Sequence, residues 1–385
     1  MNLTQFKDKA RAVLYSTAYG DALGAPVEKL THEEIKAKYG RVTTINTEWY
    51  KSSWKDNPRR RGNGIVTDDT LMTIALMNIY NENQRHLDAW DMAKGMVKEI
   101  AFKKIYIPEM DREDFLIERL FYPEKWIFIR SALVNACPRE GGIGNMINCG
   151  AAMYIAPIGI VNACNPKAAY DEAINFASGH QASYGLEAAG VLAACVAKAF
   201  EYKATVNYII ETAISVSKDG TKLAIQDICE KAVALKKQKH DRDLIVAEFH
   251  KILKSYSPMG DDVNRKVEKL GIPTDHYTPS RIFSIEELPI ALGYIVLHDG
   301  DFDEAITDGI NSGRDTDSIG VMVGVILGAL HGMSVMKSAD MKQLSSINKI
   351  NFDEVSEKFS DTAVSIIKND YEYQKQAFNN LDFVS

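Results

Sequence analysis

The 385-residue sequence predicts an all-α fold, and three observations support this prediction. Apolar residues recur at helical spacing along most of the chain, whereas the alternation typical of β-strands is scarce. Residues 184–201 are so rich in alanine that the helix they form is expected to be buried on all sides. Residues 319–331 carry Gly320, Gly324 and Gly328 at four-residue spacing, which favours close approach between neighbouring helices.

The first expected helix spans residues 5–20. It places Phe6, Ala10, Val13, Leu14 and Thr17 on one stripe, as a helix that packs against a core requires. The same periodicity predicts further helices over residues 70–80, 87–102, 166–177, 184–201, 206–216, 222–236, 244–255, 285–297, 302–309 and 319–331.

No shift in composition separates two cores, so residues 1–385 are expected to form a single domain. Three long loops decorate it, at 45–65, 137–150 and 256–284. Long loops in a compact helical body usually carry function.

The composition excludes several classes of protein. With 46% hydrophobic and 25% charged residues the chain can bury a core, and a net charge of −7 disfavours the coating of nucleic acids. The N-terminus lacks the apolar segment of a signal peptide, and no uninterrupted apolar stretch reaches the length of a membrane span. The five cysteines are odd in number and widely spaced, which is typical of reduced thiols. We therefore expect a cytoplasmic protein that makes no membrane contact.

Two short acidic clusters each come just before an apolar helix. The first is Thr67-Asp68-Asp69-Thr70, and the second is Asp315-Thr316-Asp317-Ser318. Carboxylate and hydroxyl oxygens are the ligands that hard divalent cations prefer. The carboxylates carry about four negative charges, which two divalent cations would offset and one would not. The clusters therefore predict a shared binuclear metal site.

Each cluster also has a simpler explanation. Asp, Ser and Thr are preferred helix N-caps, and acids favour the first turn of a helix. Capping needs one side chain rather than three in succession. Either cluster alone is more typical of a cap, whereas the two together are harder to explain by capping, and on spacing alone both explanations stay open.

Other polar segments leave their roles open. The glycine-rich turn at 141–150 could hold phosphate oxygens through its amides, or it could be an ordinary loop. The basic run at 59–61 could meet an anionic substrate or simply be solvated, and His180 could be structural or functional. Asp21 and Glu28 flank a turn, where a cation or a proton-transfer role would give them partners.

Taken together and in order, several blocks of the chain resemble the ADP-ribosylglycohydrolase family, which includes the dinitrogenase reductase-activating glycohydrolases. The blocks are residues 20–28, 67–70, 148–153, the segment around His180, and residues 312–318. The resemblance covers about residues 10–335. It implies a compact orthogonal all-α bundle that holds two Mg²⁺ ions, with Mn²⁺ as an alternative.

The resemblance also implies a role for each site residue. The implied metal ligands are Thr67, Asp68, Asp69, Asp315, Asp317 and Ser318. The implied catalytic residues are Glu28, Asp69 and Asp315, with Glu28 closing the site or managing the attacking water. The implied substrate-binding residues are Asn148, Cys149, Gly150, Met153, His180 and Arg314, of which Asn148 to Met153 belong to a diphosphate-holding turn and His180 contacts the nucleotide.

The chain departs from the family pattern at three positions. Arg314 stands where glycine is usual, Ser318 where threonine is usual, and Tyr154 where arginine is usual. Ser318 keeps the hydroxyl ligand, so metal binding is expected to persist. Arg314 and Tyr154 are expected to alter the substrate wall, which puts the substrate in question more than the reaction type.

The implied reaction is metal-assisted hydrolysis of a glycosidic bond at a ribose anomeric carbon. The expected partner is an ADP-ribosylated protein or a ribosylated small molecule. Three alternatives remain open: hydrolysis of another ribosylated metabolite or nucleoside, a metal-dependent phosphohydrolase that uses the same acids, and a non-catalytic relative that binds ADP-ribose.

Overall fold

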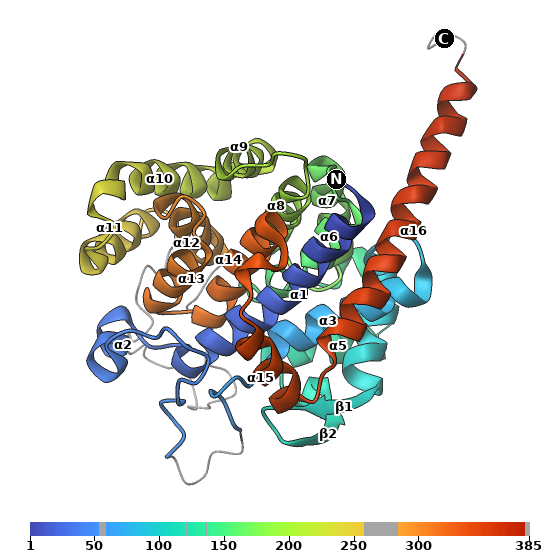
Figure 1. The fold of residues 1–385 in the computed structure, drawn as a ribbon. Coiled ribbons are helices and arrows are strands. Elements are labelled where there is room, and N and C mark those ends of the chain that lie inside the picture. Colours follow the sequence, from blue (N-terminus) through green and yellow to red (C-terminus); the bar gives the residue numbers. More distant parts are fainter. Residues whose placement is uncertain (54–58, 121, 135–136, 258–283, 382–385) are drawn as a thin grey trace.

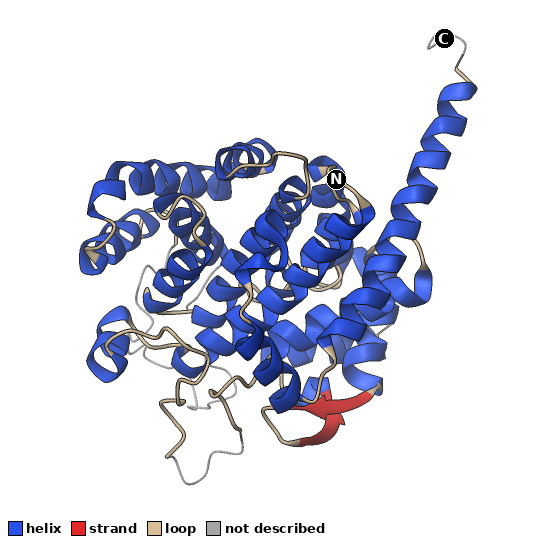
Figure 2. Ribbon diagram, viewed as in Figure 1, coloured by secondary structure: helices blue, strands red, loops and turns tan. Residues whose placement is uncertain are grey.

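The computed structural model describes residues 1–53, 59–120, 122–134, 137–257 and 284–381. Its architecture confirms the all-α prediction, since helices make up nearly all of the regular structure (Figure 2). The only strands in the described part of the chain form one antiparallel hairpin, in which β1 (Lys104–Ile107) pairs with β2 (Arg112–Phe115).

Two helices from opposite ends of the sequence cross at the centre of the molecule (Figure 1). They are α1 (Leu3–Gly24) and α14 (Thr316–His331). A Cβ atom added to Gly320 would lie 2.7 Å from the Gly20 carbonyl oxygen, and one added to Gly324 would lie 2.7 Å from that of Ser16. The glycine spacing in α14 therefore lets the two backbones touch, as expected.

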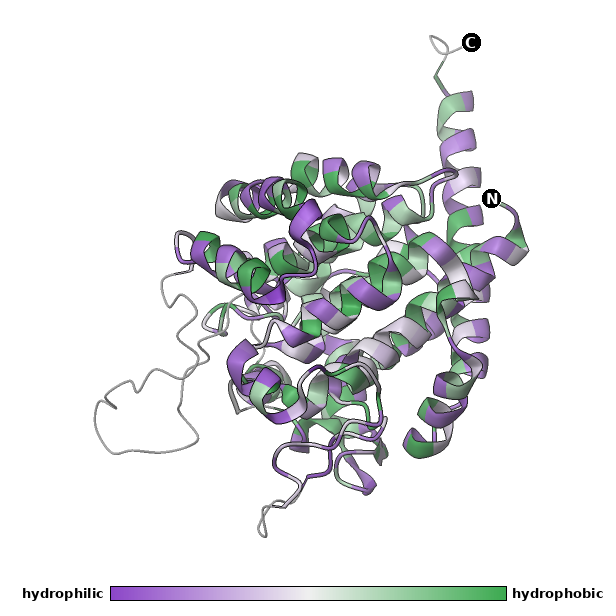
Figure 3. Cartoon of the chain, turned by 60° about the vertical axis from the view of Figure 1, so that its left-hand side comes forward, coloured by the Kyte–Doolittle hydropathy of each residue, from purple (hydrophilic) through white to green (hydrophobic). Residues whose placement is uncertain are grey.

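The remaining helices surround this pair. They are α2 (His32–Tyr39), α3 (Asp68–Asn83), α4 (Ala89–Asp91), α5 (Tyr122–Leu133), α6 (Ala156–Val161), α7 (Pro166–Ala177), α8 (Tyr184–Ala199), α9 (Val206–Val216), α10 (Asp219–Leu235), α11 (Arg242–Leu253), α12 (Ser284–Leu297), α13 (Phe302–Asn311), α15 (Ser338–Asn348) and α16 (Phe352–Asn379). Hydrophobic and hydrophilic residues alternate in bands along most of them (Figure 3). The alanine-rich α8 is buried over most of its surface, and the C-terminal end of α16 projects from the body (Figure 1).

The structure differs from the sequence expectations in three places. The helix expected over 87–102 begins at Ala89 and continues as π-type turns over Met92–Met96 and Lys98–Phe102. In these turns the backbone hydrogen bonds join residues five positions apart, one more than in an α-helix. Helices α2, α5, α6, α15 and α16 and the hairpin were not expected. The loop expected at 256–284 lies almost wholly outside the described residues.

One described helical segment, Thr316–Val335, is apolar and long enough to cross a membrane. It is longer than the helix expected over residues 319–331, because α14 begins at Thr316 and a 3₁₀ turn, Gly332–Val335, extends it. Of its apolar window, 72% is buried, and α14 packs against α1, α8, α12 and α13. These contacts are those of a core helix in a globular domain.

Candidate active site

The two acidic clusters meet at the centre of the molecule. Thr67 precedes the first turn of α3, and Asp315 precedes the first turn of α14. The Ser318 hydroxyl donates to Asp69 Oδ1 across 3.2 Å, which joins clusters that lie 249 residues apart in sequence. The side chains from both clusters are largely buried, and Asp69 and Asp317 are only 2% and 4% exposed. The fold therefore brings together the residues expected to share a site.

Asp21 holds the first cluster in place from α1. Its Oδ2 atom accepts hydrogen bonds from the Thr67 amide at 2.8 Å, the Thr70 amide at 3.2 Å and the Thr70 hydroxyl at 2.5 Å. Burial raises the pKa of Asp21 to about 6, although these hydrogen bonds oppose the shift. The partners of Asp21 Oδ2 are thus the backbone and a hydroxyl at the start of α3, whereas Oδ1 is buried without a hydrogen-bond partner among the described residues.

Backbone pairing places Glu28 beside the second cluster. The Arg314 amide donates to the Leu30 carbonyl at 2.8 Å, and the Lys29 amide donates to the Arg314 carbonyl at 2.7 Å. Gly313 has a φ of +87°, and a Cβ there would lie 2.7 Å from the His32 nitrogen, so the close pairing requires glycine. As a result, carboxylate oxygens of Glu28, Asp315 and Asp317 lie within 4.8 Å of one another.

Three acids of this site, Asp69, Asp315 and Asp317, have raised pKa values. Burial and the neighbouring Asp317 raise the pKa of Asp69 well above its usual range, and burial and Glu28 do the same for Asp317. For Asp315, burial and the carboxylate of Glu287 raise the pKa to about 8. Like charges in a desolvated site favour protons or cations between them.

Two buried arginines neutralise the edge of the acidic site. Arg119 pairs with Asp68 and with the fully buried Glu109, and Arg61 pairs with Glu28 and, at 2.7 Å, with Glu109. The run at 59–61 is therefore not a uniform basic patch that faces a substrate, because Arg61 is an internal partner of Glu28. Neither Arg119 nor Glu109 stood out in the sequence, since each lies near the hairpin without a motif.

Neighbouring basic side chains lower the pKa of Glu28. Burial by itself would raise the pKa of Glu28, but Lys29 and Arg61 outweigh it and lower this pKa far below the usual range. The Lys29 ammonium lies 3.3 Å from Glu28 Oε1. At neutral pH these charges favour the ionised form of Glu28, which makes it a weak proton acceptor.

Cys149 and Glu287 lie on the opposite side of Asp315. The Cys149 thiol is 3.3 Å from Asp315 Oδ2 and 3.1 Å from the Ser318 hydroxyl. Glu287, from the first turn of α12, is 1% exposed, and it forms with Cys149 and Asp315 a group whose polar atoms lie within 4.8 Å of one another. Glu287 was not among the residues expected from the sequence, although it belongs to a pair of acids at the start of an apolar helix, as the two acidic clusters do.

The expected diphosphate-holding turn is only partly open for a ligand. Asn148 Oδ1 accepts from the Gln181 side chain at 2.7 Å and from the Gly150 amide at 3.2 Å. A Cβ on Gly150 would lie 2.6 Å from a carboxylate oxygen of Glu124. Met153 is 6% exposed, at a 3₁₀ turn next to this loop.

Gly141 and Gly142, earlier in this loop, pack against the protein backbone. The Gly142 amide donates to the Ser178 carbonyl at 2.9 Å, and the Gly141 amide donates to that of Pro138 at 3.0 Å. The amides of Ile143 and Asn145 are also used within the turn. The amide cradle that the glycine-rich sequence suggested is therefore occupied by the chain itself over these residues.

Three residues expected near the substrate are buried instead. His180 has no exposed surface, and its ring nitrogens contact the Tyr154 hydroxyl at 2.9 Å and the Glu124 carboxylate. Tyr154 is fully buried as well. Arg314, whose φ is +74°, is 2% exposed and pairs with Glu286 at 2.5 Å. Each of these side chains is held by a polar partner in the interior.

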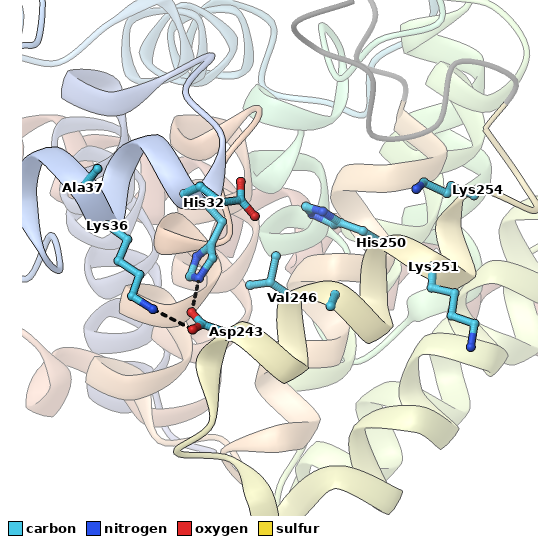
Figure 4. A pocket seen from close by; sticks show the side chains of 10 residues that line it. His32, Lys36, Ala37, Asp243, Val246, His250, Lys251 and Lys254 are labelled. Atoms are coloured by element: carbon cyan, nitrogen blue, oxygen red, sulfur yellow. Dashed lines mark hydrogen bonds and ion pairs between the residues drawn. The ribbon is translucent and has the colours of Figure 1, made fainter.

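A separate pocket of about 710 Å³ opens between α2 and α11 (Figure 4). His32 lines it and contacts Asp243 at 2.9 Å, and its other ring nitrogen lies 2.7 Å from the Asn311 carbonyl oxygen, just before the second acidic cluster. None of the clustered acids lines this pocket. It is therefore a neighbour of the candidate site and not part of it.

One family model matches nearly the whole chain. The sequence model described as ADP-ribosylglycohydrolase matches residues 2–365. The uncharacterised protein YegU of Escherichia coli K12 is 22% identical over 90% of this chain and 94% of its own length, and an uncharacterised protein of Archaeoglobus fulgidus is 25% identical over 84% and 88%. A solved structure titled ADP-ribosylglycohydrolase-related protein complex superposes with a TM-score of 0.62 at 16% identity, covering 94% of this chain and 99% of its own, which shows a shared fold.

Proposed function

Because this chain belongs to the ADP-ribosylglycohydrolase family, we propose that it is a binuclear-metal hydrolase that removes ADP-ribose from a protein or small-molecule conjugate. Family membership supports a glycohydrolase-type enzyme, and the metal use and substrate are our inference. The observation that carries the proposal is the contact of Ser318 Oγ with Asp69 Oδ1, which joins two acidic helix starts in one buried site.

The donor set fits two divalent cations. Among the described residues Asp68 and Glu28 have arginine partners, whereas no lysine or arginine pairs with Asp69, Asp315 or Asp317. Three such carboxylates, two buried and one half-buried, require compensation, and the oxygens of Thr67 and Ser318 complete a set suited to Mg²⁺ or Mn²⁺. When bound there, these ions would supply charge that lowers the pKa of a nearby water and holds ribose hydroxyls.

The residues of the chain supply the rest of the chemistry. As the glycosidic bond breaks, positive charge builds on the ribose, and the surrounding carboxylates stabilise it. Glu28 stays ionised at neutral pH, so it is suited to orienting the attacking water and the sugar by charge. Asn148, Cys149 and Gly150 border the same site and would contact the diphosphate side of the substrate.

We also place the reaction in the cytoplasm. All five cysteines are free, which fits a reducing compartment. This assignment can be examined by fractionating the cells that produce the protein.

The test of the proposed function is metal calorimetry combined with product analysis. The wild-type protein should bind two Mg²⁺ or Mn²⁺ ions and release ADP-ribose from a ribosylated protein. Asp317→Asn, which removes one charge with little change in shape, should lose metal binding and activity while its circular dichroism is retained. Asp361→Asn, at an acid that is exposed and pairs with Lys7, is the matched control and should change neither.

The products separate the alternatives. Released phosphate in place of ADP-ribose would identify a phosphohydrolase, and a free base would identify a nucleoside hydrolase. Tight binding of ADP-ribose without any product would identify a non-catalytic relative. Unaltered metal binding in Asp317→Asn would remove the second cluster from the metal site.

A further inference from the structure

One side of the acidic site has different donor chemistry from the rest. Cys149 comes from the loop before Ala152–Tyr154, Glu287 from the first turn of α12, and Asp315 from the start of α14. One polar atom from each lies within 4.8 Å of the others. Three separate elements thus bring a sulfur and two carboxylates together, while the expected Mg²⁺ ligands are all oxygens.

Glu287 forms no ion pair in the described part of the chain. It is 1% exposed, neither of its carboxylate oxygens makes a hydrogen bond of ordinary geometry, and the groups beside it are the Cys149 thiol and the Asp315 carboxyl. The adjacent Glu286 pairs with Arg314, so the guanidinium nearest to this turn is already engaged. A buried carboxylate beside another carboxylate requires a proton or a cation between them.

The thiol makes a particular cation the best match. Cys149 is buried, and its sulfur lies 3.3 Å from Asp315 Oδ2 and 3.1 Å from Ser318 Oγ, so it is directed into the acidic site. Thiolate ligands select Zn²⁺ and similar soft or borderline ions, and Zn²⁺ also accepts carboxylate oxygens. Mg²⁺ prefers oxygen ligands throughout.

We propose that Cys149, Glu287 and Asp315 form a subsite for a thiophilic divalent cation of the Zn²⁺ and Cd²⁺ class. It is distinct from the oxygen-lined set of Asp68, Asp69 and Asp317. The subsite rests on the proposed function only through Asp315, which both sets would share. On binding, the Cys149 thiol loses its proton to solvent and its sulfur bonds to the cation, with no change of oxidation state.

The test is titration of the full-length protein with Cd²⁺, followed through the ultraviolet charge-transfer band of a Cd²⁺–thiolate bond. The wild-type protein should develop this band and release a proton as it does so. Cys149→Ser should abolish the band. Glu287→Gln should weaken Cd²⁺ binding by roughly tenfold or more, at least the size of effect seen when a supporting group is lost from a metal site.

Two further variants act as controls. Cys137→Ser and Cys164→Ser alter the exposed thiols, and each should leave the band unchanged. The subsite is refuted if the band persists in Cys149→Ser, or if Glu287→Gln binds Cd²⁺ as tightly as the wild type. Circular dichroism of each variant checks that a lost band does not reflect unfolding.

One more variant separates this proposal from the proposed function. Asp68→Asn removes an expected Mg²⁺ ligand that lies outside the subsite, so the Cd²⁺ band should remain. If the wild-type protein shows the band but neither binds Mg²⁺ nor hydrolyses a ribosylated substrate, the proposed function fails and the subsite stands. If the wild-type protein binds Mg²⁺ and hydrolyses a ribosylated substrate but shows no Cd²⁺ band, the subsite fails and the proposed function stands.

Discussion

At the scale of single residues, the neighbours of Glu28 decide what it can do. Arg61 and Lys29 hold it as a carboxylate, and Arg61 is itself fixed by the buried Glu109. A general base works best when its pKa lies near the working pH, which is not so for Glu28. Its negative charge, fixed beside Asp315 and Asp317, suits the orientation of water and the stabilisation of a cationic sugar.

Glu28→Gln should separate catalysis from metal binding, because it keeps the shape and removes the charge. We expect kcat to fall by roughly 10²–10³, the range typical of losing one preorganised electrostatic group, with two metal ions still bound. Glu33→Gln, at an exposed acid in α2, is the control and should leave kcat unchanged.

Two other results would change the role of Glu28. Loss of one bound metal ion, with a matching loss of activity, would make it a ligand. Turnover close to that of the wild type would remove it from the mechanism.

At the scale of the elements, the crossing of α1 and α14 sets the geometry of the site. The Thr316 hydroxyl donates to the Gly24 carbonyl at 2.8 Å, and a Cβ on Gly24 would lie 2.5 Å from the backbone of Asp317. The first turn of α14, which carries Asp317 and Ser318, therefore rests directly on the end of α1. Any change that separates these helices should also move the acids.

Gly20→Ala should reduce both stability and metal affinity. The new methyl group would lie 2.7 Å from the Val321 amide nitrogen, and backbone atoms cannot rotate away. Overpacking of this kind typically costs about 1–3 kcal/mol. Denaturant unfolding measures the first effect, and Mg²⁺ calorimetry measures the second.

Gly309→Ala provides a matched control. It lies in α13, and the nearest atom to its added Cβ would be a side-chain methyl of Ile319 at 3.2 Å, which can adjust. We expect little change in the free energy of unfolding or in the Mg²⁺ affinity of Gly309→Ala. Equal losses in the two variants would show that helix crossing is not the cause.

At the scale of the whole molecule, the buried acids make the metal-free fold sensitive to pH. The pKa of Asp315 rises from 3.8 to about 8 on folding, because of burial and Glu287, and the pKa values of Asp69 and Asp317 rise as well. Between pH 3.8 and about pH 8 the folded protein therefore binds more protons at Asp315 than the unfolded chain does. The stability that these acids contribute is therefore present below pH 4 and is lost as the pH rises towards 8.

Mg²⁺ should reverse this loss, because it takes the place of the protons. We expect Mg²⁺ to raise the melting temperature more at pH 8 than at pH 5. Differential scanning calorimetry at both pH values, with NaCl at matched ionic strength as the control, measures the difference. A shift that is equal at the two pH values would contradict the exchange of protons for Mg²⁺ at these acids.

The sequence by itself was sufficient for the fold class and for the two acidic clusters. Helical periodicity is a local property, and the four-residue glycine spacing in α14 predicted the close crossing with α1. The pairing of Thr67–Asp69 with Asp315–Ser318 could be inferred because each motif is contiguous and lies at a helix start. Both signals can be recognised in the sequence alone, since each depends only on residues a few positions apart.

Tertiary structure alone decided which side chains face the site. His180 and Arg314 carry groups that ligands often bind, but packing buries them against Glu124 and Glu286. Arg119 reaches the acids from a segment with no motif of its own, and Glu287 reaches them from the first turn of α12. Burial and charge pairing depend on contacts between residues distant in sequence, and no local pattern encodes them.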